Sequence, residues 1–272
     1  MSKNRVLIVT QEMDPYTAVS EIAEIARKLP QFIQENGMEI RILMPRYGVI
    51  NERRHRLHEV VRLSGMNIIV DDDDYPLIIK VASLPEARMQ VYFLDNEDFF
   101  KRKATLHDSK GKSFEDNVDR MVFFCKGVME TVKKFGWSPD IIHCHGWLTS
   151  LVPLYLKTAY KSEPLFQHVK TVYSVYNDHL DEEVSSSFKE KATISNLTQS
   201  DLNIYFNGEE LNLHQGAGFY ADAIIQGSNE PNNKATAGLS YDDKPIIQDL
   251  GETGFQSYLE LYHSLLEEKV SG

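Results

Sequence analysis

Apolar residues recur along the chain in short compact runs that alternate with stretches of helical spacing. The runs Arg5 to Thr10, Glu39 to Met44 and Lys170 to Val175 are rich in β-branched residues, which is typical of buried parallel strands. Between the first two runs, apolar positions from Val19 to Ile33 recur every three or four residues and predict one face of a helix. Strand, helix and strand in close succession predict a right-handed βαβ unit.

The clearest alternation of this kind lies between Asp116 and Leu156. Apolar residues from Val118 to Val132 form one stripe of a helix, and Gly136 tolerates the left-handed conformation that ends a helix. The run from Ile141 to His145 is typical of a buried strand, and a further helix is expected from Leu148. Polar residues at the carboxyl end of a strand between two helices predict an open α/β sheet with a ligand crevice at that edge.

Two other regions predict smaller elements. Residues 55–95 contain short apolar runs separated by turn formers and by the acidic run from Asp71 to Asp74, which predicts a β-hairpin insertion. The acidic run lacks the alternating ligands and terminal glutamate of a calcium loop, so a solvated turn is expected. A helix from Glu210 to Tyr220 and a strand from Ala223 to Gln226 are expected next.

The end of the chain differs in composition. Asn229 to Asp243 is polar with almost no apolar residues, which indicates a linker or loop. Phe255 to Leu266 carries an apolar helical stripe too large to leave in water, so it should dock on the preceding domain or on a partner chain. We therefore expect one Rossmann-like α/β domain with a mainly parallel sheet over residues 1–230. Residues 231–272 should form a linker and a returning helix.

Composition narrows the class of protein. The formal charge of the 272 residues is 29 − 40 = −11, which disfavours binding to nucleic acid or to an anionic membrane. No apolar run approaches the roughly 20 residues that span a bilayer. Acidic residues follow the N-terminus too soon for a signal peptide, and two cysteines are too few for a disulfide framework. These features indicate a cytoplasmic protein.

Metal, phosphate and cofactor motifs are weak. His143 and His145 lie two apart on a predicted strand and share a face, which is half of a metal site, but no further ligands at suitable spacing appear nearby. A sugar-hydroxyl contact or a hydrogen-bonded role at the strand end is favoured. The loop from Gln11 to Thr17 contains no glycine, so a backbone cradle for phosphate is not expected there. No cofactor and no metal are predicted.

Four segments resemble glycogen and starch synthases of glycosyltransferase family 5. Residues 136–157 (GWSPDIIHCHGWLTSLVPLYLK) resemble the segment with their His-x-His-Asp-Trp motif. Residues 5–48, which end in Met-Pro-Arg-Tyr-Gly, resemble their N-terminus, and residues 170–177 (KTVYSVYN) resemble the strand that ends in their His-Asn pair. Residues 214–230 are similar to their lysine-alanine-glycine helix. The resemblance implies the N-terminal, Rossmann-like half of a GT-B hexosyltransferase, which mainly handles the glucan acceptor.

The departures from this family fall on functional positions. The Lys-Thr-Gly-Gly-Leu pattern that approaches the donor phosphates is replaced by the residues from Ala18 to Ile22, which add a carboxylate and remove a cation and two glycines. The motif Asp is Gly146, and the His of the His-Asn pair is Tyr176. The C-terminal half, which carries most donor contacts in the family, has no counterpart in this sequence.

Two functions stay open on this basis. The family reaction is glucosyl transfer from ADP-glucose to the end of an α-1,4-glucan, and the departures predict a weak or inactive enzyme unless another subunit completes it. The alternative is a non-catalytic pseudoenzyme that binds α-glucan or a maltooligosaccharide, or that regulates a partner. The departures count against ADP-glucose binding. A partner subunit or a homo-oligomer is expected.

Six side chains at the carboxyl ends of three predicted strands are candidate ligand-binding residues: Glu12, Asp14, His145, Trp147, Tyr176 and Asn177. Because such ends meet at one edge of an open α/β sheet, we expect the six to converge on one cleft. Trp147 and Tyr176 would offer flat faces to sugar rings, and the others would hydrogen-bond hydroxyl groups. The alternative is that His145, Trp147 and Tyr176 merely pack at the strand ends.

Overall fold

The computed structural model describes residues 3–84, 87, 89–180, 187–194, 197–227, 244–248 and 251–267. The expected linker from Asn229 to Asp243 lies outside these residues. The division of the chain near residue 230 therefore stays a prediction.

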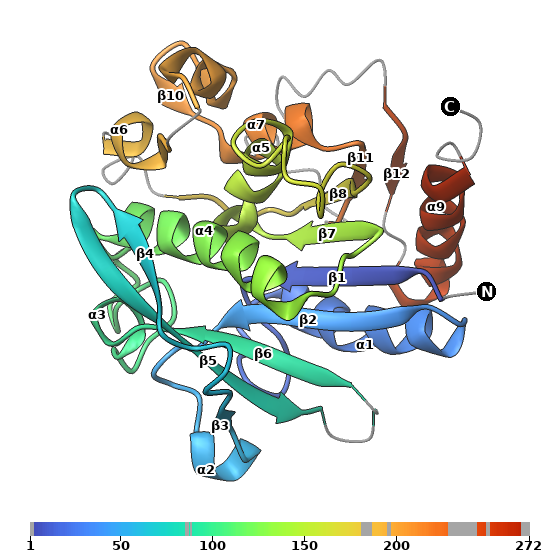
Figure 1. The fold of residues 1–272 in the computed structure, drawn as a ribbon, viewed down its shortest axis with the longest axis horizontal. Coiled ribbons are helices and arrows are strands. Elements are labelled where there is room, and N and C mark those ends of the chain that lie inside the picture. The colour runs from blue at the N-terminus through green and yellow to red at the C-terminus, as the bar shows by residue number, and fades with distance from the viewer. Residues whose placement is uncertain are drawn as a thin grey trace.

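A mixed sheet forms the centre of the molecule (Figure 1). Its parallel strands are, in spatial order, β12 (Ile246–Gln248), β11 (Ala223–Gln226), β8 (Lys170–Val175), β7 (Ile141–His145), β1 (Arg5–Thr10), β2 (Glu39–Pro45) and β6 (Gln90–Asp95). Three antiparallel strands extend it beyond β6: β5 (Asp73–Ser83), β4 (Met66–Val70) and β3 (His58–Glu59). This arrangement confirms the predicted α/β fold with a mainly parallel, Rossmann-like sheet.

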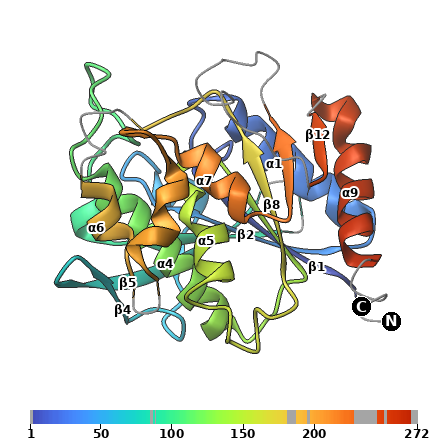
Figure 2. The same ribbon diagram turned by 90° about the horizontal axis from the view of Figure 1, so that it is seen from above.

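Helices cover both faces of the sheet (Figures 1 and 2). One face carries α1 (Glu21–Glu35) and α9 (Phe255–Glu267), which pack on each other through Phe32 and Phe255. The other face carries α4 (Asn117–Phe135), α5 (Leu151–Lys157) and α7 (Leu213–Tyr220). The central strands are consequently buried on both sides, which explains why their sequences are continuously apolar rather than alternating.

Short elements connect these layers. They are α2 (Glu52–His55), α3 (Glu97–Phe100), α6 (Phe188–Ala192), the hairpin of β9 (Phe206–Asn207) and β10 (Glu210–Leu211), and three 3₁₀ turns, η1 (Trp147–Thr149), η3 (Gln199–Tyr205) and η4 (Gly251–Gly254). The turn η1 directly follows β7 and leads into α5, so the chain turns sharply at the carboxyl end of a central strand.

Local sequence explains where the two long helices begin and end. The Ser20 hydroxyl accepts a hydrogen bond from the backbone N–H of Ile22 at 3.2 Å and so caps the start of α1. Gly136 ends α4 in the left-handed conformation at a φ of 59°. Along α4 the apolar stripe from Val118 to Val132 is buried, as its helical spacing predicts.

Three elements differ from the sequence-based expectation. The predicted helix from Glu210 begins only at Leu213, because Asn212 caps it by accepting from the N–H of Gln215 at 3.0 Å. The acidic turn is shorter than expected: Asp71 turns the chain at a φ of 58°, and Asp73 already belongs to β5. The short strand β12 was not expected at all.

The helix α9 packs on the rest of the same chain. Its apolar stripe is buried, including Tyr258, Tyr262 and Leu265, and it lies beside α1 (Figure 2). Among the described residues, no helix combines the length and the apolar character needed to cross a membrane.

Candidate functional site

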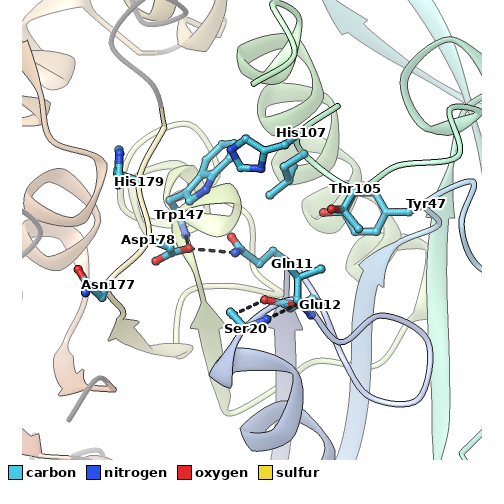
Figure 3. A pocket seen from close by; sticks show the side chains of 12 residues that line it. Gln11, Glu12, Ser20, Tyr47, Thr105, His107, Trp147, Asn177, Asp178 and His179 are labelled. Atoms are coloured by element: carbon cyan, nitrogen blue, oxygen red, sulfur yellow. Dashed lines mark hydrogen bonds between the residues drawn. The ribbon is translucent and has the colours of Figure 1, made fainter. Parts of the chain in front are cut away.

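A cavity of about 210 Å³ opens beyond the carboxyl ends of β1, β7 and β8 (Figure 3). This is the edge at which parallel α/β sheets present their ligand sites. Twelve residues line it: Gln11, Glu12, Val19, Ser20, Tyr47, Thr105, Leu106, His107, Trp147, Asn177, Asp178 and His179.

The structure brings three of the six predicted residues to this cavity. Glu12, Trp147 and Asn177 line it. His145 and Tyr176 lie in the interior instead, where His145 Nδ1 is hydrogen-bonded to the Tyr176 hydroxyl at 2.8 Å. Asp14 is exposed to solvent and is not among the lining residues. The six side chains therefore do not all converge on one cleft.

The two aromatic side chains expected to stack on sugar rings are covered by protein. Trp147 is 2% exposed, so it forms part of the cavity wall rather than an open platform. Tyr176 is also buried, and a Cβ atom placed on Gly227 would lie 2.4 Å from its ring. Close packing at the strand ends accounts for both residues in this conformation.

Glu12 uses its carboxylate to shape the loop that enters α1. Oε2 accepts hydrogen bonds from the backbone N–H groups of Val19 at 2.8 Å and Ser20 at 3.2 Å, and Oε1 accepts from the Ser20 hydroxyl. Burial raises the pKa of Glu12, hydrogen bonds from Ser20 and Val19 oppose this rise, and the charge of Asp178 adds to it. Glu12 is thus an internal acceptor whose oxygens are already engaged.

His143 and His145 form a buried stack under the cavity. Their ring centroids lie 3.9 Å apart, and His143 is hydrogen-bonded through Nδ1 to the Tyr262 hydroxyl at 2.6 Å and through Nε2 to the Ser174 hydroxyl at 2.7 Å. Burial lowers the pKa of His143 far below its usual value, and it lowers the pKa of His145 to about 3. Both rings are consequently neutral at pH 7.

These contacts engage both ring nitrogens of His143 with hydroxyl groups rather than leaving one for a metal ion. In the part of the chain that the structure describes, no group of three or more His, Cys, Asp or Glu side chains is placed to hold a metal. We therefore describe the two histidines as polar members of the core.

Gln11 and Asp178 are site residues that the sequence analysis missed. Gln11 Nε2 donates to Asp178 Oδ2 at 2.9 Å, and Gln11 Oε1 accepts from the backbone N–H of Leu148 at 3.2 Å. The same Asp178 oxygen accepts from the backbone N–H of Trp147 at 3.2 Å (Figure 3). The only available signal was that both residues are polar and lie in the loops that follow two predicted strands.

Gly146 makes room for this arrangement. Its φ of 85° and ψ of 160° belong to a region that side-chain-bearing residues rarely adopt. A Cβ atom at this position would lie 2.4 Å from Cδ of Gln11. The glycine therefore allows the Gln11 side chain to cross the turn and reach Asp178.

A buried histidine supports the loop from behind. His214 Nε2 donates to the backbone carbonyl of Asp178 at 2.6 Å, and it lies 3.3 Å from Asp178 Oδ1. The hydroxyl of Tyr173 lies 2.8 Å from the other ring nitrogen of His214. This contact fixes the main chain of the loop after β8 against α7.

The cavity offers hydrogen-bond acceptors and no strong cation. Its titratable lining comprises Glu12, Asp178, His107, His179 and the phenol of Tyr47, and no lysine or arginine is among the twelve lining residues. Lys103 lies in an adjoining groove that shares Val19, Thr105 and His107 with the cavity. Carboxylate and amide oxygens suit the hydroxyl groups of a neutral polyol better than a polyanion.

The mainly parallel sheet, with helices on both faces and a polar cavity at its carboxyl edge, defines a Rossmann-like α/β domain. Residues 5–233 match the family model of the starch synthase catalytic domain, and the chain belongs to this family. This confirms the resemblance inferred from the four sequence segments.

Individual relatives agree with this assignment. Glycogen synthases of Pelodictyon phaeoclathratiforme and of Chlorobaculum tepidum are each 44% identical to the chain over 174 residues, which make up 64% of this chain and 36% of each relative. The match thus spans little more than a third of the length of each of these relatives.

A solved structure shares the fold. It is the catalytic domain of starch synthase IV from Arabidopsis thaliana bound to ADP and acarbose, at a TM-score of 0.71 and 20% sequence identity. The match covers 92% of this chain and 52% of that one. At this level of identity the likeness concerns the fold alone.

Proposed function

We propose that this chain is an α-glucan-binding member of the starch synthase family that does not by itself transfer glucose from ADP-glucose. The observation that carries the proposal is the lining of the cavity, in which acceptor oxygens of Gln11, Asn177 and Asp178 occur without a lysine or arginine. A glucan terminus presents many neutral hydroxyl donors, whereas ADP-glucose brings a diphosphate that needs nearby positive charge.

The loop before α1 supports the proposal that the chain does not by itself transfer glucose from ADP-glucose. The N–H groups of Val19 and Ser20 already donate to the Glu12 carboxylate, and the N–H of Ile22 donates to Ser20. Glu21 adds a further negative charge to the first turn of the helix. A phosphate at this helix N-terminus would meet fewer free donors and more negative charge than such sites ordinarily offer.

A second function is favoured by the family match. The chain would be a glucosyltransferase if another polypeptide supplied the cations of the donor site, and the solved catalytic domain of starch synthase IV from Arabidopsis thaliana is bound to ADP and acarbose. On this account the cavity holds the acceptor and a partner subunit holds the donor.

Calorimetric titration of the purified chain with maltoheptaose and, separately, with ADP-glucose tests the proposal. We expect saturable binding of maltoheptaose and no heat from ADP-glucose. Transfer of radiolabelled glucose from ADP-glucose into glycogen, above a control without protein, would instead support the second function. Absence of maltoheptaose binding would overturn the proposed glucan site.

A further inference from the structure

The strand β4 has one unpaired edge. Among the described strands it pairs with β5 alone, and a tight turn closes this hairpin between Val70 and Asp73. Hydrogen-bonded pairs alternate from such a turn, so the main chains of Asn67 and Ile69 point away from β5. The Ile69 carbonyl shows this direction, because it accepts a hydrogen bond from Nζ of Lys126 on α4 at 2.8 Å. The strand β4 therefore presents pairing groups that no described strand uses.

A groove of about 690 Å³ runs along this edge. The β4–β5 hairpin lines it on one side, and α6 and the loop after α5 line it on the other. Helix α4, which contacts both β4 and α6, adds to the lining (Figures 1 and 2). Asn67 and Ile69 both line the groove and are exposed, Ile69 by 57%. A chain segment lying in the groove can therefore reach the edge of β4.

The groove is acidic. Five carboxylates line it, against two lysines. Asp71, Asp72 and Glu190 are exposed and form no ion pair in the part of the chain that the structure describes. One of the two lysines, Lys191, is already paired with Asp119 at 2.6 Å. Basic side chains that enter the groove would meet uncompensated negative charge.

The other lysine, Lys126, occupies one acceptor of the edge. Burial lowers the pKa of Lys126 to about 8, so its charge is held there at a cost in free energy. Lysine side chains commonly protect exposed strand edges in this way. A backbone N–H of an added strand can replace Lys126 at the Ile69 carbonyl, and release of the ammonium into water recovers part of that cost.

We propose that the β4 edge is a docking site for an extended, basic segment of another protein, which adds as a strand beside β4. The main chains of Asn67 and Ile69 pair with this segment, and Asp71, Asp72 and Glu190 receive its lysine or arginine side chains. A row of outward main-chain donors and acceptors matches extended backbone, and the charge of the groove favours a basic sequence. The inference is independent of the proposed glucan-binding function.

The probe is a fluorescein-labelled, acetylated octapeptide of alternating lysine and valine, titrated with the full chain and followed by fluorescence anisotropy. We expect saturable binding. One control peptide carries an N-methyl group on every backbone amide, which keeps the charge but removes the strand-pairing donors. A second control has glutamate in place of lysine, which keeps the backbone and reverses the charge. Both should bind at least about tenfold more weakly. Equal binding of the N-methylated peptide would show charge attraction alone and would overturn the inference.

A substitution at Asn67 tests the main-chain contact. Asn67→Pro removes an N–H that faces away from β5, so the hairpin keeps its own hydrogen bonds. We expect this variant to bind the lysine peptide about tenfold more weakly than the wild type. Asn67→Ala keeps the N–H and should bind like the wild type. Wild-type affinity in a folded Asn67→Pro variant would contradict strand addition at β4.

A substitution on α4 tests the same edge without changing its main chain. Lys126→Met frees the Ile69 carbonyl and removes a positive charge, so the lysine peptide should bind about threefold more tightly. Lys134→Met is the matched control. Lys134 also donates to a main-chain carbonyl, that of Ser64 at 3.2 Å, but it does not line the groove. Unchanged or weaker binding to Lys126→Met would show that the peptide does not compete for this carbonyl.

The contribution of charge is tested on the hairpin turn. The double variant Asp71→Asn with Asp72→Asn should bind the lysine peptide about fivefold more weakly, because two exposed carboxylates are lost. Glu115→Gln removes an exposed carboxylate outside the groove and should have no effect. An equal change in the two variants would mean that the peptide responds to net charge and not to this groove.

A second copy of the chain is the competing occupant of the edge. Sedimentation equilibrium at the concentrations of the peptide titration should show a monomer for the wild type and for Asn67→Pro. A wild-type dimer that Asn67→Pro dissociates would assign the edge to a second copy, and the inferred partner would be wrong.

Discussion

Gly146 allows the Gln11 side chain, which follows β1, to pack against the turn that follows β7. Its backbone conformation is strained for any L-residue, and Gln11 occupies the space that a side chain would need. We predict that Gly146→Ala lowers the free energy of unfolding by about 1–3 kcal/mol and weakens the contact between Gln11 and Asp178. Urea unfolding measures the change.

Gly208→Ala provides the matched control for this substitution. Gly208 also has a positive φ, of 68°, but a Cβ atom there would meet no atom within 4 Å. It should therefore suffer the backbone strain without the clash. An equal loss of stability in the two variants would show that the approach of Gln11 to Gly146 carries no cost.

The two stacked histidines predict a loss of stability in acid. Burial lowers the pKa of both His143 and His145 in the folded chain, the latter to about 3, so the unfolded chain binds more protons below its ordinary pKa of about 6.5. The two neutral histidines contribute fully to the free energy of unfolding above that pH, and this contribution is lost as the pH falls toward 3. The slope should approach about 1.4 kcal/mol per pH unit for each histidine.

Urea unfolding at a series of pH values between 7 and 4 checks this dependence. His145→Gln, which cannot gain a proton, should flatten the profile relative to the wild type. Glu12 opposes the trend, because its raised pKa favours the folded chain as the pH falls through the range above 4.5. A profile for His145→Gln as steep as that of the wild type would contradict the assignment.

For individual residues, the sequence could predict that polar residues gather at the strand ends, but it could not predict the direction in which each side chain points. Glu12, Trp147 and Asn177 reach the cavity because strand ends meet at one edge of the sheet. His145 fails to reach it, since its side chain faces the α9 side of the sheet together with His143. The pairing of Gln11 with Asp178 joins residues 167 positions apart, and no local pattern contains that information.

The helix α9 is attached to the core by a hydrogen bond to β7 as well as by its apolar stripe. The Tyr262 hydroxyl is hydrogen-bonded to Nδ1 of His143 on β7, and both side chains are fully buried. Tyr262→Phe should destabilise the fold by about 1–3 kcal/mol, because one nitrogen of His143 would lose its partner inside the protein. Thermal or urea unfolding provides the measurement.

Tyr16→Phe is the comparison for this change. Tyr16 is also buried, but its hydroxyl has no hydrogen-bond partner among the described residues. Removal of that hydroxyl should leave stability unchanged or increase it. A larger loss in Tyr16→Phe than in Tyr262→Phe would refute the importance of the contact between α9 and β7.

Compact apolar runs were predictable, including the four residues of β11, whereas strands of two or three residues were not. The strands β1 and β8 have the expected bounds, because compact β-branched runs flanked by polar loops leave little ambiguity. The strand β12 has three residues and no alternation of its own, and it exists because β11 offers it a parallel edge. The hairpin of β9 and β10 displaced the start of α7 for a similar reason: two-residue strands leave no periodic signal.

For the molecule as a whole, α9 and the sheet should unfold as one unit. Leu259 on α9 is buried in the shared core, whereas His263 on the same helix is exposed. Leu259→Asp should therefore lower the stability of the entire chain by more than about 3 kcal/mol, and His263→Asp should change it by less than about 0.5 kcal/mol. Fluorescence and circular dichroism should report one coincident transition. Separate transitions for helix and sheet would contradict this expectation.

The contact between α9 and β7 also constrains how the chain is made. About 110 residues separate His145 from Phe255, and at ordinary rates of translation roughly ten seconds pass between their syntheses. During that interval the histidine face of β7 has neither its hydroxyl partner on Tyr262 nor its apolar cover. A sheet with this face uncovered is therefore present on the ribosome before α9 is synthesised, and the nascent chain is most exposed to chaperones and to self-association in that interval.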